Sequence, residues 1–192
     1  MTFRFLEETH EYFLADTPIR SVTQVLADVG MVDYRFGNEN AALRGTYVHR
    51  ATEMIDKGTL DWEGLDDILR PYCEAYRKWK EEAHPEIILS EKPMYHAKYL
   101  YAGTLDRVIR LNGSLVLIDI KTGVPSAATS VQVAAYIELA RVNEDMHIFK
   151  GYVLHLRDDG TYRVNEVKDL KKQFQIFLAA LTVARWRREH VV

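Results

Sequence analysis

The stretch from residue 103 to residue 121 constrains the fold of this chain more than any other. Two runs rich in Val, Ile and Leu flank the dipeptide Asn112-Gly113. Asn followed by Gly readily adopts the positive φ angles of a type I′ turn, so the pattern predicts an antiparallel hairpin with a two-residue loop. A loop of this length also fixes the register of the two strands, and therefore the side chains that meet across the hairpin.

The register brings charged side chains together. If Leu111 faces Ser114, counting back along both strands places Asp106 opposite Asp119, with Cβ atoms about 4.5–5.5 Å apart. Side chains alternate along a strand, so Asp119 and Lys121 project from one face while Val116, Ile118 and Ile120 cover the other. Two acids and a lysine are therefore expected in one small patch.

Such a patch lowers stability unless something offsets the repulsion. Asp119 and Lys121 end a strongly apolar strand, where solvation is poor and a charge is costly. A raised carboxylate pKa, a neighbouring ammonium or a divalent cation with oxygen ligands can offset the cost. We favour the cation. The structural alternative is that Asp106 and Asp119 are separately solvated, or salt-bridged to Lys121 and Arg107.

The acid pair belongs to an ordered series of motifs. Gly-x-x-Asp, Asp-x-Lys and Gln-x-x-x-Tyr are matched in turn by Gly103 and Asp106, Asp119 and Lys121, and Gln132 and Tyr136. Upstream, Gly45 and His49 match Gly-x-x-x-His, with Glu53 one turn later. This series, over roughly residues 20–140, resembles the PD-(D/E)XK nucleases, specifically their RecB-like and phage-type exonuclease branch. Leu105 stands where the family's name places proline, a site that is commonly apolar in this branch.

The resemblance implies the αβββαβ core of the restriction-endonuclease-like fold, an α/β architecture with a mixed sheet between helical layers. The sequence pattern agrees, with helices over about 38–57, 65–83 and 127–141, strands over 87–121 and 147–167, and a final helix after Asp169. Residues 3–20 alternate aromatic and polar positions, which predicts a peripheral N-terminal hairpin. Ser21 then caps a helix. The hairpin and the extra helices are additions to the core, and we expect one domain over residues 1–192.

The resemblance also implies roles for the motif residues. Asp106, Asp119 and the backbone carbonyl of Ile120 would bind Mg²⁺, for which Mn²⁺ would substitute. His49 would complete the metal site through a neutral ring nitrogen, or contact the phosphate. Lys121 would orient or deprotonate the attacking water and stabilise the negative charge that develops on the phosphate.

Other polar residues receive weaker assignments. By resemblance, Gln132 would hold the strand end or the substrate and Tyr136 would lie near phosphate, although both can also serve structural roles. Glu53 would act on the metal through water or orient the motif histidine. Glu91 could approach the metal from a neighbouring strand, but we expect it to be an exposed glutamate at a sheet edge. The Arg185–Arg188 cluster either binds phosphate or complements the dipole of its helix.

Composition limits the class of protein without identifying a substrate. The net charge of −3, from 25 basic and 28 acidic residues, gives no overall attraction to nucleic acid, so a DNA contact must rely on a local basic surface. The single Cys73 excludes an internal disulfide and fits a reducing compartment. No secretory signal and no apolar run of the roughly 18 residues that cross a bilayer occur. We expect no membrane association, and a cytoplasmic location in a bacterial or phage-infected cell.

The sequence thus predicts a Mg²⁺-dependent deoxyribonuclease, an exonuclease of phage or recombination and repair type. It would act on DNA with a free end and leave 5′-phosphate products. Three alternatives stay open: an endonuclease of the same fold, a non-catalytic nucleic-acid-binding subunit, and a metal enzyme for another phosphate substrate. A recombination or single-strand-binding protein is a candidate partner. Polarity, strand preference and oligomeric state are not set by the sequence.

Overall fold

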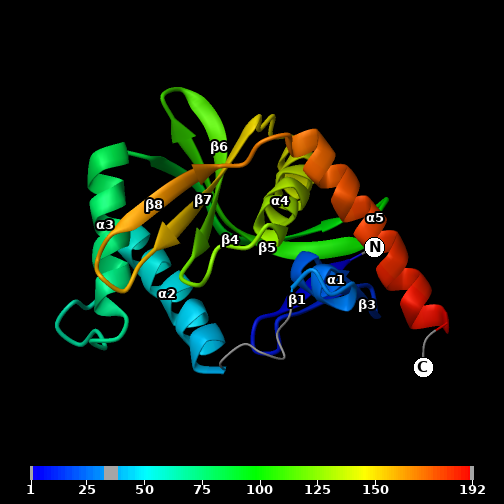
Figure 1. Cartoon of the computed structure of the whole chain (residues 1–192), viewed down its shortest axis with the longest axis horizontal. Coiled ribbons are helices and arrows are strands. Elements are labelled where there is room, and N and C mark those ends of the chain that lie inside the picture. The colour runs from blue at the N-terminus through cyan, green and yellow to red at the C-terminus, as the bar shows by residue number, and fades with distance from the viewer. Residues whose placement is uncertain (1, 33–38, 191–192) are drawn as a thin grey trace.

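The computed structural model describes residues 2–32 and 39–190. Its helices are α1 (Val22–Asp28), α2 (Glu39–Lys57), α3 (Arg70–Ala83), α4 (Ala128–Glu144) and α5 (Leu170–His190). Its strands are β1 (Phe3–Leu6), β2 (Glu11–Leu14), β3 (Thr17–Ser21), β4 (Glu86–His96), β5 (Tyr101–Leu111), β6 (Ser114–Lys121), β7 (Lys150–Leu156) and β8 (Tyr162–Glu166). Helices cover a mixed sheet on both faces (Figure 1), which is the predicted α/β architecture. Among the described residues, no helix has both the length and the apolar character needed to cross a membrane.

The sheet divides along its central strand. Within the described residues, eight strands pair in the order β1-β2-β3-β5-β6-β7-β8, and β4 also pairs with β5. β4 runs antiparallel to β5 from Glu86 to His96 and so occupies one edge of it. β3 and β6 must therefore share the other edge, with β3 pairing at Tyr101 and Ala102 and β6 pairing from Arg107 onward. The residues of β5 between these two pairings lie where the sheet splits.

The central hairpin has the predicted turn and register. Leu111 pairs with Ser114, and both residues of the loop have positive φ, 49° at Asn112 and 79° at Gly113. Positive φ at both positions is what a type I′ turn requires. The sequence-based prediction of this hairpin is therefore confirmed.

The hairpin ladder ends just before the predicted acid pair. Antiparallel pairing continues as far as Arg107 and Ile118. One step further, Asp106 and Asp119 are in register, but the backbone pairing stops. Instead, Oδ2 of Asp106 accepts a hydrogen bond from the backbone N–H of Ile120, at 2.6 Å. The Asp106 carboxylate thus takes the place of a ladder hydrogen bond at the point where the two strands separate.

Two apolar layers hold the helices to the sheet. On one face, α1, α4 and α5 pack over a buried layer that includes Val22, Leu105, Val108, Leu117, Val131 and Phe177. On the other face, α2 and α3 pack over Val48, Tyr76, Ile109, Val116, Ile118 and Ile120. Odd and even residues of β6 separate cleanly between the two layers, because side chains alternate along a strand. Figure 1 shows the two groups of helices on opposite sides of the strands.

The N-terminal hairpin borders the split in the sheet, so the expectation of a peripheral element is wrong. Tyr12 of β2 is 2% exposed, and its hydroxyl lies 2.9 Å from Oγ1 of Thr104 and 3.0 Å from Nε2 of His10. Thr104 precedes Asp106 by two residues on β5, so both side chains leave the same face. The hairpin reaches this position because β3 joins the sheet at β5, a pairing that local patterns do not reveal.

Gly103 lies in the split, where a side chain has no room. A Cβ at this position would lie 2.6 Å from Cε1 of the buried Tyr136 and 3.4 Å from Cγ2 of Val22. Gly103→Ala is therefore expected to lower the free energy of unfolding by about 1–3 kcal/mol, measured by urea denaturation. Gly123→Ala is the matched control, because no atom lies within 4 Å of the corresponding Cβ. Equal losses in the two variants would contradict the steric argument.

Candidate active site

Asp106 and Asp119 lie one step beyond the last pair of the hairpin ladder, at the split in the sheet, and both are buried, at 6% and 0% exposure. Oδ2 of Asp106 is held by the Ile120 amide, and Oδ1 lies 3.5 Å from Nδ1 of His49. Oδ2 of Asp119 lies 2.7 Å from Nζ of Lys121. Apart from that ion pair, neither oxygen of Asp119 has a hydrogen-bond partner among the described residues.

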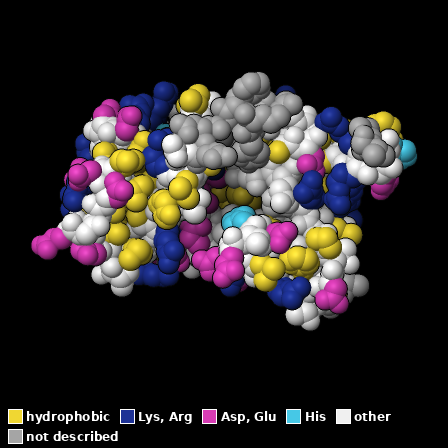
Figure 2. All heavy atoms as spheres, turned by 90° about the horizontal axis from the view of Figure 1, so that it is seen from below, with side chains coloured by type: hydrophobic (Ala, Val, Ile, Leu, Met, Phe, Trp, Pro, Cys, Tyr) yellow, Lys and Arg dark blue, Asp and Glu magenta, His cyan; other side chains and the backbone are white. Residues whose placement is uncertain are grey.

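His49 joins this pair from helix α2. Its Nδ1 faces two carboxylates, Oδ1 of Asp106 and Oε1 of Glu91, the latter at 3.3 Å. Ligand atoms of His49, Glu91 and Asp106 all lie within 4.8 Å of one another. Figure 2 shows acidic side chains and a histidine around a hollow in the middle of the face seen from below. The structure thus gathers donors of the kind that bind cations, from α2, β4 and β5.

Glu91 lies on an edge strand, as the sequence predicts, because β4 pairs only with β5 among the described strands, but its side chain is less exposed than expected. Its side chain is 23% exposed, and Oε1 accepts a hydrogen bond from a terminal nitrogen of Arg107 at 2.7 Å. Its backbone has φ +45° within strand β4, a left-handed conformation that costs about 1–3 kcal/mol for a residue other than glycine. The prediction failed because the side of β4 that carries this carboxylate depends on its pairing with β5 and on that local backbone conformation.

The acids and the histidine shift one another's pKa. Burial raises the pKa of Asp106 to about 6, with the charge of His49 opposing the rise and that of Asp119 adding to it. Burial by itself would lower the pKa of His49, but Asp106 and Glu91 outweigh it and raise the pKa. Burial would likewise raise the pKa of Glu91, yet His49 and Arg107 lower it. The carboxylates therefore favour a positive charge between them.

Gln132 and Tyr136 bring helix α4 to the same place. Nε2 of Gln132 donates a hydrogen bond to the Tyr136 hydroxyl at 3.0 Å, and both residues are buried. Burial, and then the charges of Asp106 and Asp119, raise the pKa of Tyr136 well above its ordinary value. The phenol therefore stays protonated beside the carboxylates and keeps its O–H as a donor.

Comparison with known protein families matches residues 26–190 to the PD-(D/E)XK nuclease superfamily. The chain belongs to this superfamily. A candidate exonuclease from Eubacterium rectale has a similar fold, with a TM-score of 0.56 and 13% identity over 93% of this chain and 77% of that chain. An alkaline exonuclease from Laribacter hongkongensis aligns with a TM-score of 0.43 and 12% identity over 88% of this chain and 91% of that chain. No curated protein matches the sequence significantly. The predicted family and fold class are confirmed.

The site of this nuclease fits a divalent cation with hard ligands. Carboxylate oxygens and an imidazole nitrogen suit such ions, and Oδ1 of Asp119 is buried without a partner among the described residues. A buried, unpartnered carboxylate oxygen is costly unless a cation or an ordered water meets it. The predicted donors were His49, Asp106, Asp119 and the carbonyl of Ile120. The compact three-residue group contains the first two and adds Glu91, while Asp119 lies toward Lys121.

Sequence reasoning missed the residues that support His49. Glu53, predicted to orient His49 or to act on the metal through water, forms an ion pair with Lys57 at 2.7 Å, and the carboxylate beside His49 is Glu91. Thr52 and Asp56 instead contact the sheet near the site. Their spacing of three and seven residues from His49 places them on the same helical face, which is the signal that could have found them.

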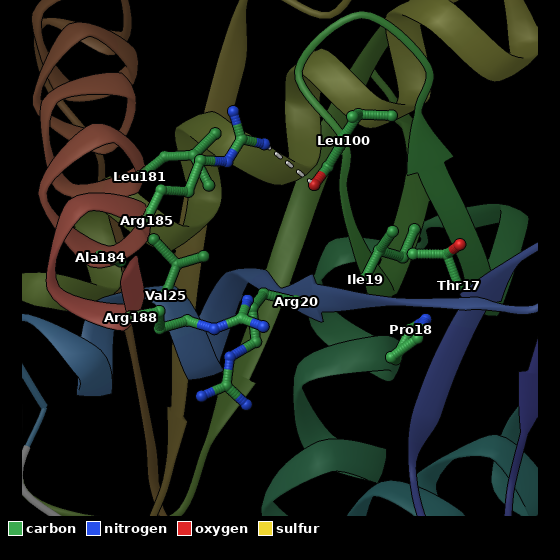
Figure 3. A pocket seen from close by; sticks show the side chains of 10 residues that line it. All are labelled: Thr17, Pro18, Ile19, Arg20, Val25, Leu100, Leu181, Ala184, Arg185 and Arg188. Carbon is green, nitrogen blue, oxygen red and sulfur yellow. Dashed lines mark hydrogen bonds between the residues drawn. The ribbon is translucent and has the colours of Figure 1, made fainter. Parts of the chain in front are cut away.

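The arginines near the end of the nuclease's last helix lie elsewhere. Arg185 and Arg188 line a cavity of about 180 Å³ beside β3, which none of the predicted catalytic residues lines (Figure 3). Arg185 donates a hydrogen bond to the carbonyl of Leu100 at 3.2 Å, and Arg187 donates one to the carbonyl of Asp28 at 2.7 Å. Two of these arginines thus attach α5 to neighbouring segments.

Proposed function

We propose that this nuclease is a divalent-metal-dependent deoxyribonuclease, and specifically an exonuclease that works from a free DNA end. The observation that carries the proposal is the buried acid pair, Asp106 and Asp119, with Lys121 against one acid and His49 and Glu91 against the other. Three carboxylates in one cluster favour a cation, and a cation with an adjacent ammonium favours an anionic phosphate.

Five residues would hold the cation. His49, Asp106 and Asp119 supply side-chain donors, Ile120 supplies its backbone carbonyl, and Glu91 adds a further carboxylate. When bound, Mg²⁺, or Mn²⁺ in its place, supplies Lewis acidity and positive charge at the scissile phosphate. The mixture of hard oxygen donors and a single imidazole is consistent with either ion.

Lys121 supports the attack on phosphorus. Its ammonium lies 2.7 Å from Asp119, and its side chain is 28% exposed, so it can reach a substrate in the hollow. We infer that it orients the attacking water or, in its neutral amine form, accepts the proton of that water, and that as the ammonium it stabilises the negative charge that develops on the phosphate oxygens. In-line attack by the water forms one P–O bond and breaks the bond to the 3′ oxygen. The products carry a 5′-phosphate and a 3′-hydroxyl.

Gln132 and Tyr136 position the substrate in this scheme. Because the phenol of Tyr136 stays protonated and its oxygen already accepts a hydrogen bond from Gln132, its O–H is oriented and can donate to a phosphate oxygen. Gln132 helps to hold the strand end through the same pair. Both assignments follow the family motif, and the buried position of the pair beside the acids supports them.

The wider context follows the resemblance. We propose that residues 1–192 form a single nuclease domain with a role in phage replication, recombination or repair, working in the cytoplasm on DNA ends. A recombination or single-strand-binding protein is the corresponding candidate partner.

Labelled DNA tests the proposed function directly. Linear duplex and single-stranded DNA, labelled at one end, are incubated with Mg²⁺ beside covalently closed circular DNA, using the wild type and Asp106→Asn. We expect stepwise shortening of linear DNA to products with 5′-phosphates, intact circles, and no cleavage in EDTA or by the variant. Cleavage without a divalent ion, or by the variant at the wild-type rate, would refute the proposal.

The same assay separates the alternatives. A cut in the closed circle identifies an endonuclease of the same fold. Binding of DNA without cleavage in Mg²⁺ or Mn²⁺ identifies a non-catalytic subunit. Faster hydrolysis of small phosphodiesters than of DNA identifies a different phosphate substrate.

A further inference from the structure

Arg107 is completely buried, at 0% exposure, and the proposed chemistry does not use it. It follows Asp106 on β5, and its side chain points toward α2, where Thr52 and Asp56 lie. The guanidinium donates to Oδ2 of Asp56 at 2.6 Å, Oε1 of Glu91 at 2.7 Å, the backbone carbonyl of Asp106 at 2.7 Å and Oγ1 of Thr52 at 3.2 Å. Its three nitrogens are thus all engaged.

These bonds join the three elements that supply the compact donor group. Thr52 and Asp56 lie on α2, on the helical face that also carries His49. Glu91 lies on β4, and the carbonyl of Asp106 belongs to β5. Asp56 is itself held by the Tyr76 hydroxyl, at 2.9 Å to Oδ2, and by Lys80. A single guanidinium therefore sets the separation between α2 and the strands that carry the carboxylates.

Stability alone does not account for this arrangement. Buried ion pairs are often replaceable by apolar side chains without loss of stability, because removing two charges from water offsets their attraction. Arg107 lies beside the apolar layer that contains Ile109, Val116 and Ile118. An apolar side chain could fill its volume, but it would take a donor away from the buried carboxylate of Asp56. What an apolar residue cannot do is hold several acceptors in fixed directions, as the planar guanidinium does.

Glu91 shows what this orientation achieves. Its backbone adopts the left-handed region, and its carboxylate oxygen is shared between Arg107 and His49. The bond from Arg107 thus fixes the carboxylate in the one place where it also meets the histidine. Without it, the Glu91 carboxylate keeps, among the described residues, only its contact with His49.

We propose that Arg107 is a positioning residue of the nuclease site, which orients Glu91 toward His49 and fixes the His49 helix against the Asp106 strand. This inference rests on the proposed metal-dependent function of the same site. Arg107 contacts neither the substrate nor the reacting atoms. It acts by placing the donors before a cation or a DNA end arrives.

The test measures Mn²⁺ binding to the folded protein without DNA, by calorimetry, in the wild type, Arg107→Met and Arg107→Lys. Arg107→Met is expected to weaken Mn²⁺ binding about 10- to 100-fold, the usual effect of removing a group that orients metal ligands. Cleavage should show kcat lowered by a similar factor while KM for DNA changes less than about threefold. The Mn²⁺ affinity and kcat of Arg107→Lys should lie between those of the wild type and of Arg107→Met, because lysine keeps the positive charge but lacks the planar guanidinium.

Ile109→Ala is the matched control, since it removes a buried side chain from the same strand and the same face. It should lower the melting temperature while leaving Mn²⁺ affinity and kcat unchanged. Arg107 variants that behave like Ile109→Ala, with lower melting temperature alone, would overturn the inference. If Arg107→Met does not fold, the Mn²⁺ affinity and kcat of Arg107→Lys test the inference instead. If the wild type neither binds Mn²⁺ nor cleaves DNA, the proposed function itself is refuted. If the wild type binds Mn²⁺ and the Arg107 variants bind it equally well, only the inference about Arg107 is refuted.

Discussion

Lys121→Ala is expected to lower the rate of DNA cleavage by about 10³-fold or more, because the variant loses both a proton-transfer group and a positive charge beside the phosphate. The fold should stay intact, since Lys121 ends its strand and its side chain is partly exposed. Single-turnover cleavage of end-labelled DNA measures the rate, and circular dichroism with thermal melting checks the fold.

Asp119→Ala should abolish cleavage as well, because it removes a proposed metal ligand. Removing a buried carboxylate with an unpartnered oxygen should not harm the fold. Lys168→Ala is the control for loss of a lysine. Lys168 forms a similar ion pair, 2.6 Å from Glu166, but is 72% exposed, so full activity is expected. Turnover at the wild-type rate in both Lys121→Ala and Asp119→Ala would leave the proposed chemistry without support.

Asp106→Asn is expected to abolish cleavage and, in EDTA at pH 8, to make the protein more stable. The pKa of Asp106 is raised from 3.8 to about 6 in the folded state, so folding favours the protonated acid. Its contribution to stability is fully present below about pH 4 and is lost as the pH rises through 6. A rise of this size corresponds to about 3 kcal/mol. Asparagine stays neutral and avoids the loss.

Thermal and urea unfolding between pH 4 and pH 8 test whether Asp106→Asn is more stable than the wild type at high pH. The advantage of Asp106→Asn should be absent near pH 4 and grow toward pH 8. Adding Mn²⁺ should raise the melting temperature of the wild type and leave that of the variant unchanged. Asp159→Asn is the control, because hydrogen bonds from Thr161 lower the pKa of that carboxyl and the substitution should bring no gain at pH 8. A wild type that is more stable than Asp106→Asn at pH 8 in EDTA would refute the assignment of Asp106 as a strained buried acid.

The parts of the site that local rules govern were predictable. The dipeptide Asn112-Gly113 specified the turn, and the length of the loop set the register that brings Asp106 and Asp119 to the end of the hairpin ladder. Ion pairing of Asp119 with Lys121 follows from the two-residue period of the strand. The fold class was predictable because the order of elements and the motif series agreed, and the match to the superfamily confirms it.

The supporting residues were not predictable in this way. Glu91 and His49 are 42 residues apart in the chain, and Arg107 and Asp56 are 51 apart. Their contacts depend on the pairing of β4 with β5 and on the packing of α2 against the sheet. In the sequence, Arg107 follows the acid of the Gly-x-x-Asp motif and resembles an ordinary charged surface residue, although it is fully buried.

The sequence by itself determined the hairpin, its register and the identity of the motif residues, because turn propensity and side-chain alternation act between neighbours in the chain. Only the tertiary structure decided that Glu91 completes the donor group, that Arg107 holds it there, and that the N-terminal hairpin borders the site. Those outcomes arise from burying two apolar layers at once. That burial brings distant segments together, and their charged groups then pair with the neighbours that the packing supplies, as Arg107 does with Asp56 and Glu91.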